Sequence, residues 1–155
     1  MIILNIVSMF LLVLPLNPQL DKQPVVYVKH LEPPLHYPAL ARAVRFHGTV
    51  IVKLTIGTDG VVLGAESSPQ DSNMVGFPLL RDETEKLLKK WTFGCVFCSS
   101  GPYSHTVRFH YVLEGDEVTY DDTRVEMQLP DEVTITVSPP VCDDCPTPAK
   151  PKKSH

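Results

Sequence analysis

The chain has 155 residues, 43% of them hydrophobic, and a formal net charge of -4 at pH 7. That length and composition suit one folded domain with an apolar core, flanked by tails. The mildly acidic balance, with no basic run before the last few residues, indicates a protein that does not bind nucleic acid. The prolines, 15 in all, cluster in residues 15–38 and 139–151, which predicts linkers or tails on both flanks.

The first segment is an uncharged apolar run from Ile2 to Leu16. A membrane-spanning helix needs about 20 apolar residues, whereas a run of this length is typical of a secretory signal. No Lys or Arg precedes the run, and no clear cleavage site follows it. We expect residues 1–20 to be an export signal. An uncleaved membrane anchor and a buried strand or helix are the alternatives.

Residues 21–36 are predicted to be a linker. The segment is polar and punctuated by proline, apart from a short apolar piece at Val25–Val28. This piece either belongs to the linker or forms one strand that joins the domain later. Pro38 and the alanine-rich residues after it then favour one or two turns of helix.

The clearest strand signal is the alternation of side chains between Thr49 and Ile56. Apolar side chains fall on one face and polar ones on the other, and this period of two predicts a strand with one buried face. Asp59 and Gly60 supply the chemistry of a hairpin turn. Val61–Glu66 is the predicted returning strand.

Residues 77–91 are predicted to form the main helix, because Leu80, Thr84, Leu87, Leu88 and Trp91 recur at helical spacing. Two acid–base pairs four residues apart support it, with the acid first in each: Asp82 with Lys86, and Glu85 with Lys89. The predicted core at the seam of helix and sheet consists of Val50, Val52, Leu54, Leu87, Trp91 and Phe93.

Alternation returns in the last third of the chain. Val107, Phe109 and Tyr111 share one face of a predicted strand. Residues 114–138 then predict an added hairpin, with alternating apolar side chains on either side of Pro130 and Asp131. Residues 139–155 are rich in proline and lysine, and we expect a tail without regular structure.

The order of these elements resembles the C-terminal domain of the TonB family. The resemblance covers residues 37–113 and is carried by Tyr37, Pro38, Ala41, Gly48, Val50, Val52, Asp59, Gly60, Val61, Trp91, Phe93 and the strand Val107–Leu113. It implies an α+β fold in which one main helix lies across a small antiparallel sheet. This chain would add a C-terminal β-hairpin to that fold.

The resemblance also implies a mode of binding. Domains of this kind grip outer-membrane receptors by strand addition, in which a receptor segment pairs with the open edge of the last strand. In this chain that partner-binding edge corresponds to His105, Val107, Phe109, Tyr111 and Leu113. Because the added hairpin must bury its apolar face, we expect it to lie beside the sheet and to cover or extend this edge.

Three departures from the family's transducers weigh against energy transduction. The linker of about 20 residues reaches at most about 70 Å, the apolar N-terminal run has no His, and a hairpin follows the last family strand. We therefore predict an exported protein-binding module of the periplasm or cell envelope, with no enzymatic activity and no cofactor. A TonB-dependent receptor is the candidate partner.

Two other functions stay open from the residues alone. One is an energy-transducing component of TonB-dependent outer-membrane transport, anchored in the inner membrane. The other is a structural protein stapled by zinc.

The four cysteines form two C-x-x-C pairs, Cys95 with Cys98 and Cys142 with Cys145. Disulfides are the default in an exported protein, either within each pair or between the pairs. Zinc would need all four thiolates. A redox centre is disfavoured because Cys95 follows the C-terminus of a helix, whereas a helix N-terminus is what lowers a thiol pKa.

No metal site is predicted from the histidines. His105 and His110 are five residues apart on a strand, so their side chains point to opposite faces and cannot share an ion.

Overall fold

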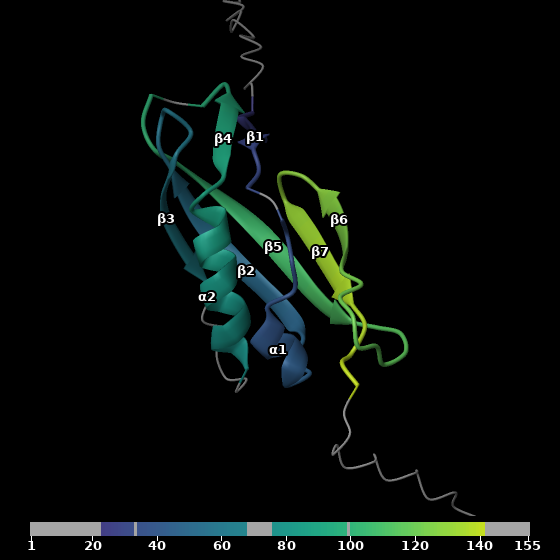
Figure 1. Cartoon of the computed structure of the whole chain (residues 1–155). Helices are drawn as coiled ribbons and strands as arrows, with labels where there is room; N and C mark the ends of the chain where they lie inside the picture. Colours follow the sequence, from purple (N-terminus) through teal and green to yellow (C-terminus); the bar gives the residue numbers. More distant parts are fainter. Residues whose placement is uncertain (1–22, 33, 68–75, 99, 142–155) are drawn as a thin grey trace, which may run out of the picture.

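The computed structural model describes residues 23–32, 34–67, 76–98 and 100–141, and within them it shows an α+β fold with one main helix (Figure 1). Five strands form one sheet in the order β3-β2-β5-β7-β6, and β1 and β4 form a second sheet. The strands are β1 (Val25–His30), β2 (Gly48–Ile56), β3 (Val62–Ser67), β4 (Thr92–Val96), β5 (Tyr103–Leu113), β6 (Arg124–Gln128) and β7 (Glu132–Val137). The helices are α1 (Ala39–Ala43) and α2 (Phe77–Leu88).

Strands β2 and β3 form the predicted hairpin. Apolar side chains of β2 alternate into the core, and Val50, Val52, Leu54 and Ile56 are fully buried. Gly60 has a φ of 90° in the turn, a conformation that favours glycine. The turn also touches β4, because the Phe93 N–H donates to the Gly60 carbonyl over 2.8 Å.

The main helix, α2, packs over β2 and β3. It buries Phe77, Leu80, Thr84 and Leu88, all of which face the sheet. Leu87, predicted to belong to the core, is only partly buried and packs against the core's margin. The aromatic centre of the core is Trp91, whose ring centroid lies 6.3 Å from that of Phe93 and 5.9 Å from that of Phe109.

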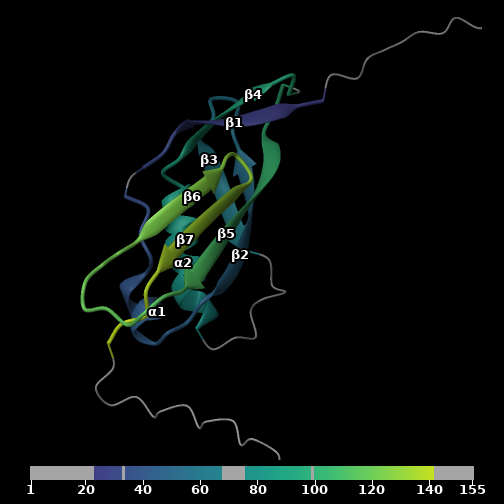
Figure 2. The same ribbon diagram turned by 90° about the vertical axis from the view of Figure 1, so that its right-hand side faces the viewer.

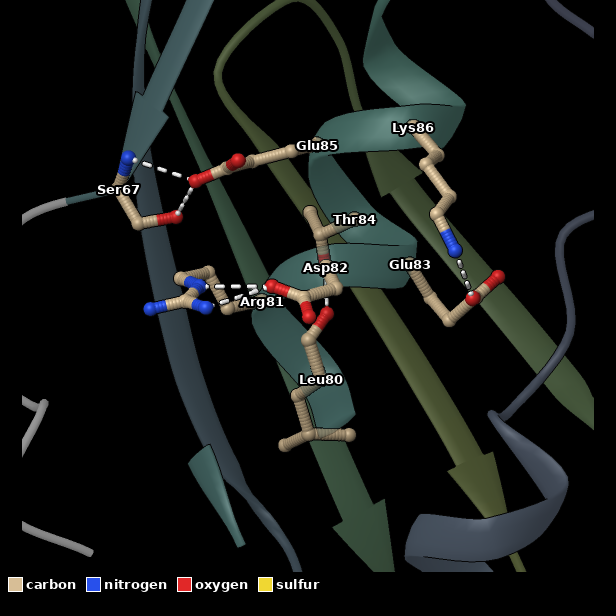
Figure 3. A network of polar contacts seen from close by, with 8 residues as sticks. All are labelled: Ser67, Leu80, Arg81, Asp82, Glu83, Thr84, Glu85 and Lys86. Atoms are coloured by element: carbon tan, nitrogen blue, oxygen red, sulfur yellow. Dashed lines mark hydrogen bonds and ion pairs between the residues drawn. The ribbon is translucent and has the colours of Figure 1, made fainter. Parts of the chain in front are cut away.

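The predicted helix pairs four residues apart do not form, because Asp82, Glu85 and Lys86 each contact another residue (Figure 3). Lys86 Nζ lies 2.9 Å from Glu83 Oε1, so it pairs three residues away instead of with Asp82. Asp82 Oδ1 accepts a hydrogen bond from the neighbouring Arg81. The Glu85 carboxylate points toward β3 and accepts hydrogen bonds from the N–H and the hydroxyl of Ser67.

The sequence predicted only one of the two strands of the smaller sheet, and only as an alternative. Val25–Val28, left open as linker or strand, lie in β1, which pairs antiparallel with β4 from Val25↔Val96 to Val28↔Phe93. Strand β4 was not predicted, because Gly94 and Cys95 interrupt any alternation of apolar and polar side chains along its five residues. The Tyr27 ring occupies the space above Gly94, where an added Cβ would lie 2.3 Å from Tyr27 Cζ.

The added residues enlarge the main sheet. β7 runs parallel to β5, pairing Glu132–Val137 with Arg108–Leu113, and β6 pairs antiparallel with β7 (Figure 2). Val133, Ile135 and Val137 of β7 are fully buried. Strand β7 is therefore part of the core, whereas β6 contributes only the partly buried Val125.

We predict that Gly60→Ala destabilises the fold whereas Gly64→Ala does not. A Cβ on Gly60 would lie 2.0 Å from the Phe93 carbonyl oxygen and would force a positive φ on alanine, at a cost of about 1–3 kcal/mol or more. The same atom on Gly64 meets nothing nearer than Thr55 Cβ at 3.8 Å. Urea unfolding of both variants checks this, and equal midpoints would contradict the close turn–β4 contact.

Candidate partner-binding edges

Strand β5, the predicted partner-binding strand, lies inside the main sheet. It pairs with β2 from Tyr103 to Tyr111 on one side and with β7 from Arg108 to Leu113 on the other. Parallel pairing with Arg108 opposite Glu132 directs the backbone of Arg108, His110 and Val112 toward β7. Among the described strands, none pairs with β5 on the β7 side before Arg108.

The five residues predicted to receive a partner have side chains on the face toward α2. Val107 and Phe109 are fully buried, Tyr111 is 3% exposed, and His105 and Leu113 are partly buried. Because these side chains face the core, a partner could bind this strand only through hydrogen bonds to its backbone. Binding of a partner at these residues stays a prediction.

Tyr111 shows how closely this face is sealed by the helix. The Thr84 hydroxyl donates its hydrogen to the Leu80 carbonyl over 2.6 Å. Because that hydrogen is already used, the Tyr111 hydroxyl is the donor in its 2.8 Å contact with Thr84 Oγ1. Burial raises the pKa of Tyr111 to about 12. The phenol therefore stays neutral at physiological pH and satisfies a polar pair under α2.

The two histidines of β5 point to opposite faces, as predicted. His105 Nε2 lies 3.3 Å from the Pro130 carbonyl and 3.3 Å from Asp131 Oδ1, so it ties β5 to the turn between β6 and β7. His110 Nδ1 lies 3.0 Å from Thr49 Oγ1 on the outer face. Within the described residues, no three His, Cys, Asp or Glu side chains come together as a metal site would require.

Displacing β7 from β5 would be costly. Burying a Val or Ile side chain contributes about 1.5–3 kcal/mol, so Val133, Ile135 and Val137 together contribute about 5–9 kcal/mol as an upper estimate. A partner strand that took the place of β7 would have to supply at least a comparable free energy. The native pairing therefore outcompetes an ordinary weak peptide at Arg108–Leu113.

Two arginines from α1 and the residues after it hold the ends of the added strands. Arg42 Nε donates to the Ser138 carbonyl over 3.0 Å, and its Nη2 donates to the Tyr120 carbonyl over 2.8 Å. Arg45 pairs with Glu117 and also donates to the Pro140 carbonyl over 3.1 Å. These contacts join segments far apart in sequence, because they link the family region to the connection between β5 and β6 and to the residues that follow β7.

Asp122 completes this polar clasp, defined as Arg42, Arg45, Asp122 and Ser138. Its carboxylate accepts from the Ser138 N–H over 2.9 Å and from the Ser138 hydroxyl over 2.6 Å. Those hydrogen bonds lower the pKa of Asp122 below its ordinary value. The clasp thus fixes the point where β7 ends.

Strand β6 is the outer edge that the added strands create. The Arg108 N–H donates to the Asp131 carbonyl, which directs the backbone of the odd-numbered residues of β7 toward β5 and that of the even-numbered ones toward β6. In β6, the residues opposite those even positions are Arg124, Glu126 and Gln128. It follows that the N–H and C=O groups of Val125 and Met127 point outward, where no described strand meets them.

The side chains of β6 also differ between its two faces. Val125 and Met127 continue the apolar row of β7, and Met127 remains 46% exposed. Arg124, Glu126 and Gln128 lie on the opposite, polar face. This edge offers free backbone groups beside a half-covered apolar row, with charges that limit indiscriminate pairing.

The other edge of the main sheet, β3, is partly capped. The Ser67 N–H, on the side away from β2, donates to Glu85 Oε1 over 3.0 Å, and the Ser67 hydroxyl donates to the same oxygen over 2.6 Å (Figure 3). The Glu85 side chain of α2 thus accepts the hydrogen bond that the last backbone N–H of β3 could otherwise give to a partner strand. β6 is the less obstructed of the two edges.

The first cysteine pair closes on itself, since Cys95 and Cys98 form a disulfide three residues apart at the end of β4. Joined in this way, the two sulfurs supply no thiolate to a zinc ion. Cys142 and Cys145 lie outside the described residues, as does the predicted export signal in residues 1–20. No helix in the described part combines the length and apolar character required to cross a membrane.

We predict that Arg42→Ala loosens the added strands. The change removes two hydrogen bonds from a charged donor and should lower the free energy of unfolding by about 1.5–3 kcal/mol. Arg124→Ala, on the polar face of β6, is the matched control and should change it by less than about 0.5 kcal/mol. Equal losses in chemical denaturation would show that the clasp does not hold β7.

We predict that the Asp122–Ser138 contact weakens in acid. Because the folded-state pKa of Asp122 is depressed, its contribution is present above the ordinary carboxyl pKa of about 3.9 and is lost as pH falls through the lower folded value. The Ser138 amide resonance should shift in that window. In Asp122→Asn the resonance should not titrate; a titration that persists in this variant would assign the shift to another group.

Comparison with known families agrees with this architecture. A family model described as Gram-negative bacterial TonB protein C-terminal matches residues 33–113, just over half of the chain and up to the end of β5. The added strands β6 and β7 lie beyond the matched region. No curated protein matches the chain. The chain therefore belongs to the TonB C-terminal domain family, whose members are protein-interaction domains of the Gram-negative envelope.

Proposed function

We propose that this protein is an exported protein-binding module of the cell envelope that receives a partner segment at β6 instead of β5. One observation carries the proposal: β7 pairs with β5 along Arg108–Leu113 and so occupies most of the edge that the family resemblance assigns to strand addition. A partner that binds in the family's manner needs a free strand edge. β6 supplies one.

The energetic comparison between the two edges supports this choice. Binding at β5 would first expose three fully buried side chains of β7 and break the clasp that Arg42 and Asp122 make with Ser138. Binding at β6 would break no contact between described elements. The partner would gain main-chain hydrogen bonds to Val125 and Met127.

The pattern of β6 indicates what the partner segment should contain. On the core side, an incoming strand would lie next to Val125 and Met127, so it needs apolar residues at alternate positions. On the other side it would face Arg124 and Glu126, so a residue of opposite charge beside each would favour one register. An extended segment of a TonB-dependent receptor is the proposed partner.

Export fits the chemistry of the cysteines. Disulfides persist in oxidising compartments such as the periplasm and are rare in the bacterial cytosol. The disulfide between Cys95 and Cys98 and the apolar run Ile2–Leu16 therefore support the same localisation.

The test is titration of the isotopically labelled chain with synthetic peptides for the extended periplasmic segments of the outer-membrane receptors from the same organism. We predict that amide resonances of Val125 and Met127 shift on binding. Met127→Pro removes an outward N–H and should abolish binding, whereas Met127→Ala keeps that N–H and should weaken it only modestly. The Pro/Ala pair separates main-chain recognition from side-chain packing.

Other outcomes would contradict the proposal. Shifts confined to Arg108–Leu113, together with loss of the β7 signals, would place the partner at β5. Full binding by Met127→Pro would exclude strand addition at β6. Absence of binding by every receptor segment would remove the receptor as the partner.

A further inference from the structure

The two-stranded sheet carries an exposed apolar tip that neither the core nor the β6 edge uses. Val25 and Val96 are 55% and 44% exposed, and they lie opposite each other in the register of β1 and β4. Tyr27, two residues along the same face of β1, is 44% exposed. Phe97 follows Val96 directly and is 56% exposed. We call these four residues the tip.

The tip is built to hold its apolar groups outward. Tyr27 rests over Gly94, where any side chain would collide with its ring. The disulfide between Cys95 and Cys98 closes the short loop that contains Phe97, and Phe97 itself has a φ of 64°. A left-handed conformation is uncommon for a bulky residue, so the loop orients Phe97 at a conformational cost.

The position of the tip in the chain indicates what it faces. The tip lies at the end of the molecule opposite α1 (Figure 1), and the chain enters the described structure there, at Gln23. The uncharged run Ile2–Leu16 ends only nine residues before Val25. Nine residue steps reach at most about 32 Å, so any membrane that holds that run lies within this distance of the tip.

We propose that the apolar run is retained as the anchor that the sequence leaves open, and that the tip contacts the lipid surface of the membrane that holds it. Valine and phenylalanine side chains enter the boundary between headgroups and acyl chains, and tyrosine is enriched at that depth. Lys29 lies on the same face of β1 as Tyr27 and is exposed, so its ammonium group would meet anionic headgroups. The contact would leave α1, at the opposite end of the molecule, pointing away from the bilayer (Figure 1).

Fluorescence quenching by brominated lipid tests the contact. The full chain, with residues 1–22 verified by intact mass, is reconstituted into vesicles of phosphatidylethanolamine and phosphatidylglycerol with brominated acyl chains. Tryptophan replaces Tyr27 or Phe97 in two variants. Tyr120→Trp is the control, because Tyr120 is 64% exposed and its carbonyl accepts from Arg42 of α1, at the opposite end.

The native Trp91 is fully buried and gives a constant background in every variant. We expect quenching of Tyr27→Trp and Phe97→Trp to exceed that of Tyr120→Trp several-fold. Adding Val96→Asp to Phe97→Trp should remove most of that excess, since an exposed carboxylate opposes insertion. Circular dichroism confirms that each variant is folded.

Two results would overturn the proposal. Equal quenching of all three variants would show that the tip has no preferred contact with lipid. A blue-shifted but unquenched emission from Tyr27→Trp and Phe97→Trp would show that protein covers the tip, as in self-association. Neither result bears on β6, so the proposed partner edge is tested separately.

Discussion

The parallel pairing of β7 with β5 is the interaction on which the rest of the structure depends. Over Arg108–Leu113 it turns the last strand of the family domain from an edge into an interior strand, and it buries three apolar side chains that would otherwise have no cover. It also requires the chain to leave β5, run back along the outer edge of the sheet as β6 and return as β7 in the direction of β5. The clasp from Arg42, Arg45 and Asp122 fastens the residues that follow β7 to α1 and to the segment before β6.

Much of this fold could be predicted because its strongest patterns are local. The period of two in β2 and the helical spacing of α2 report burial directly, and Trp91 and Phe93 are indeed fully buried. Contacts between distant segments leave weaker traces. Strand β4 lies among glycine and cysteines, and its partner β1 lies in a proline-rich stretch, so neither shows a clear alternation. The predicted pair of Glu85 with Lys89 does not form for a related reason: Glu85 instead accepts a hydrogen bond from Ser67, which lies 18 residues away in the sequence.

The candidate site shows the same division. Alternation predicted which face of β5 is apolar, but the direction of β7 and its register with β5 depend on the clasp, whose residues are unremarkable in the sequence. The outward backbone groups of Val125 and Met127 follow from that register alone. A binding edge of this kind carries no residue signature, because main-chain groups make the contacts. The exposed tip on β1 and β4 has no pattern in the sequence either, because its residues lie in a proline-flanked stretch and between two cysteines.

Native-state amide hydrogen exchange along β5 tests the central claim most directly. The N–H groups of Arg108, His110 and Val112 point toward β7, whereas those of Val107, Phe109 and Tyr111 point toward β2. If β7 is a permanent member of the sheet, both sets should exchange with similar, near-global protection. Fast exchange of Arg108, His110 and Val112 beside slow exchange of the other three would show that β7 opens on its own, and that β5 is available to partners after all.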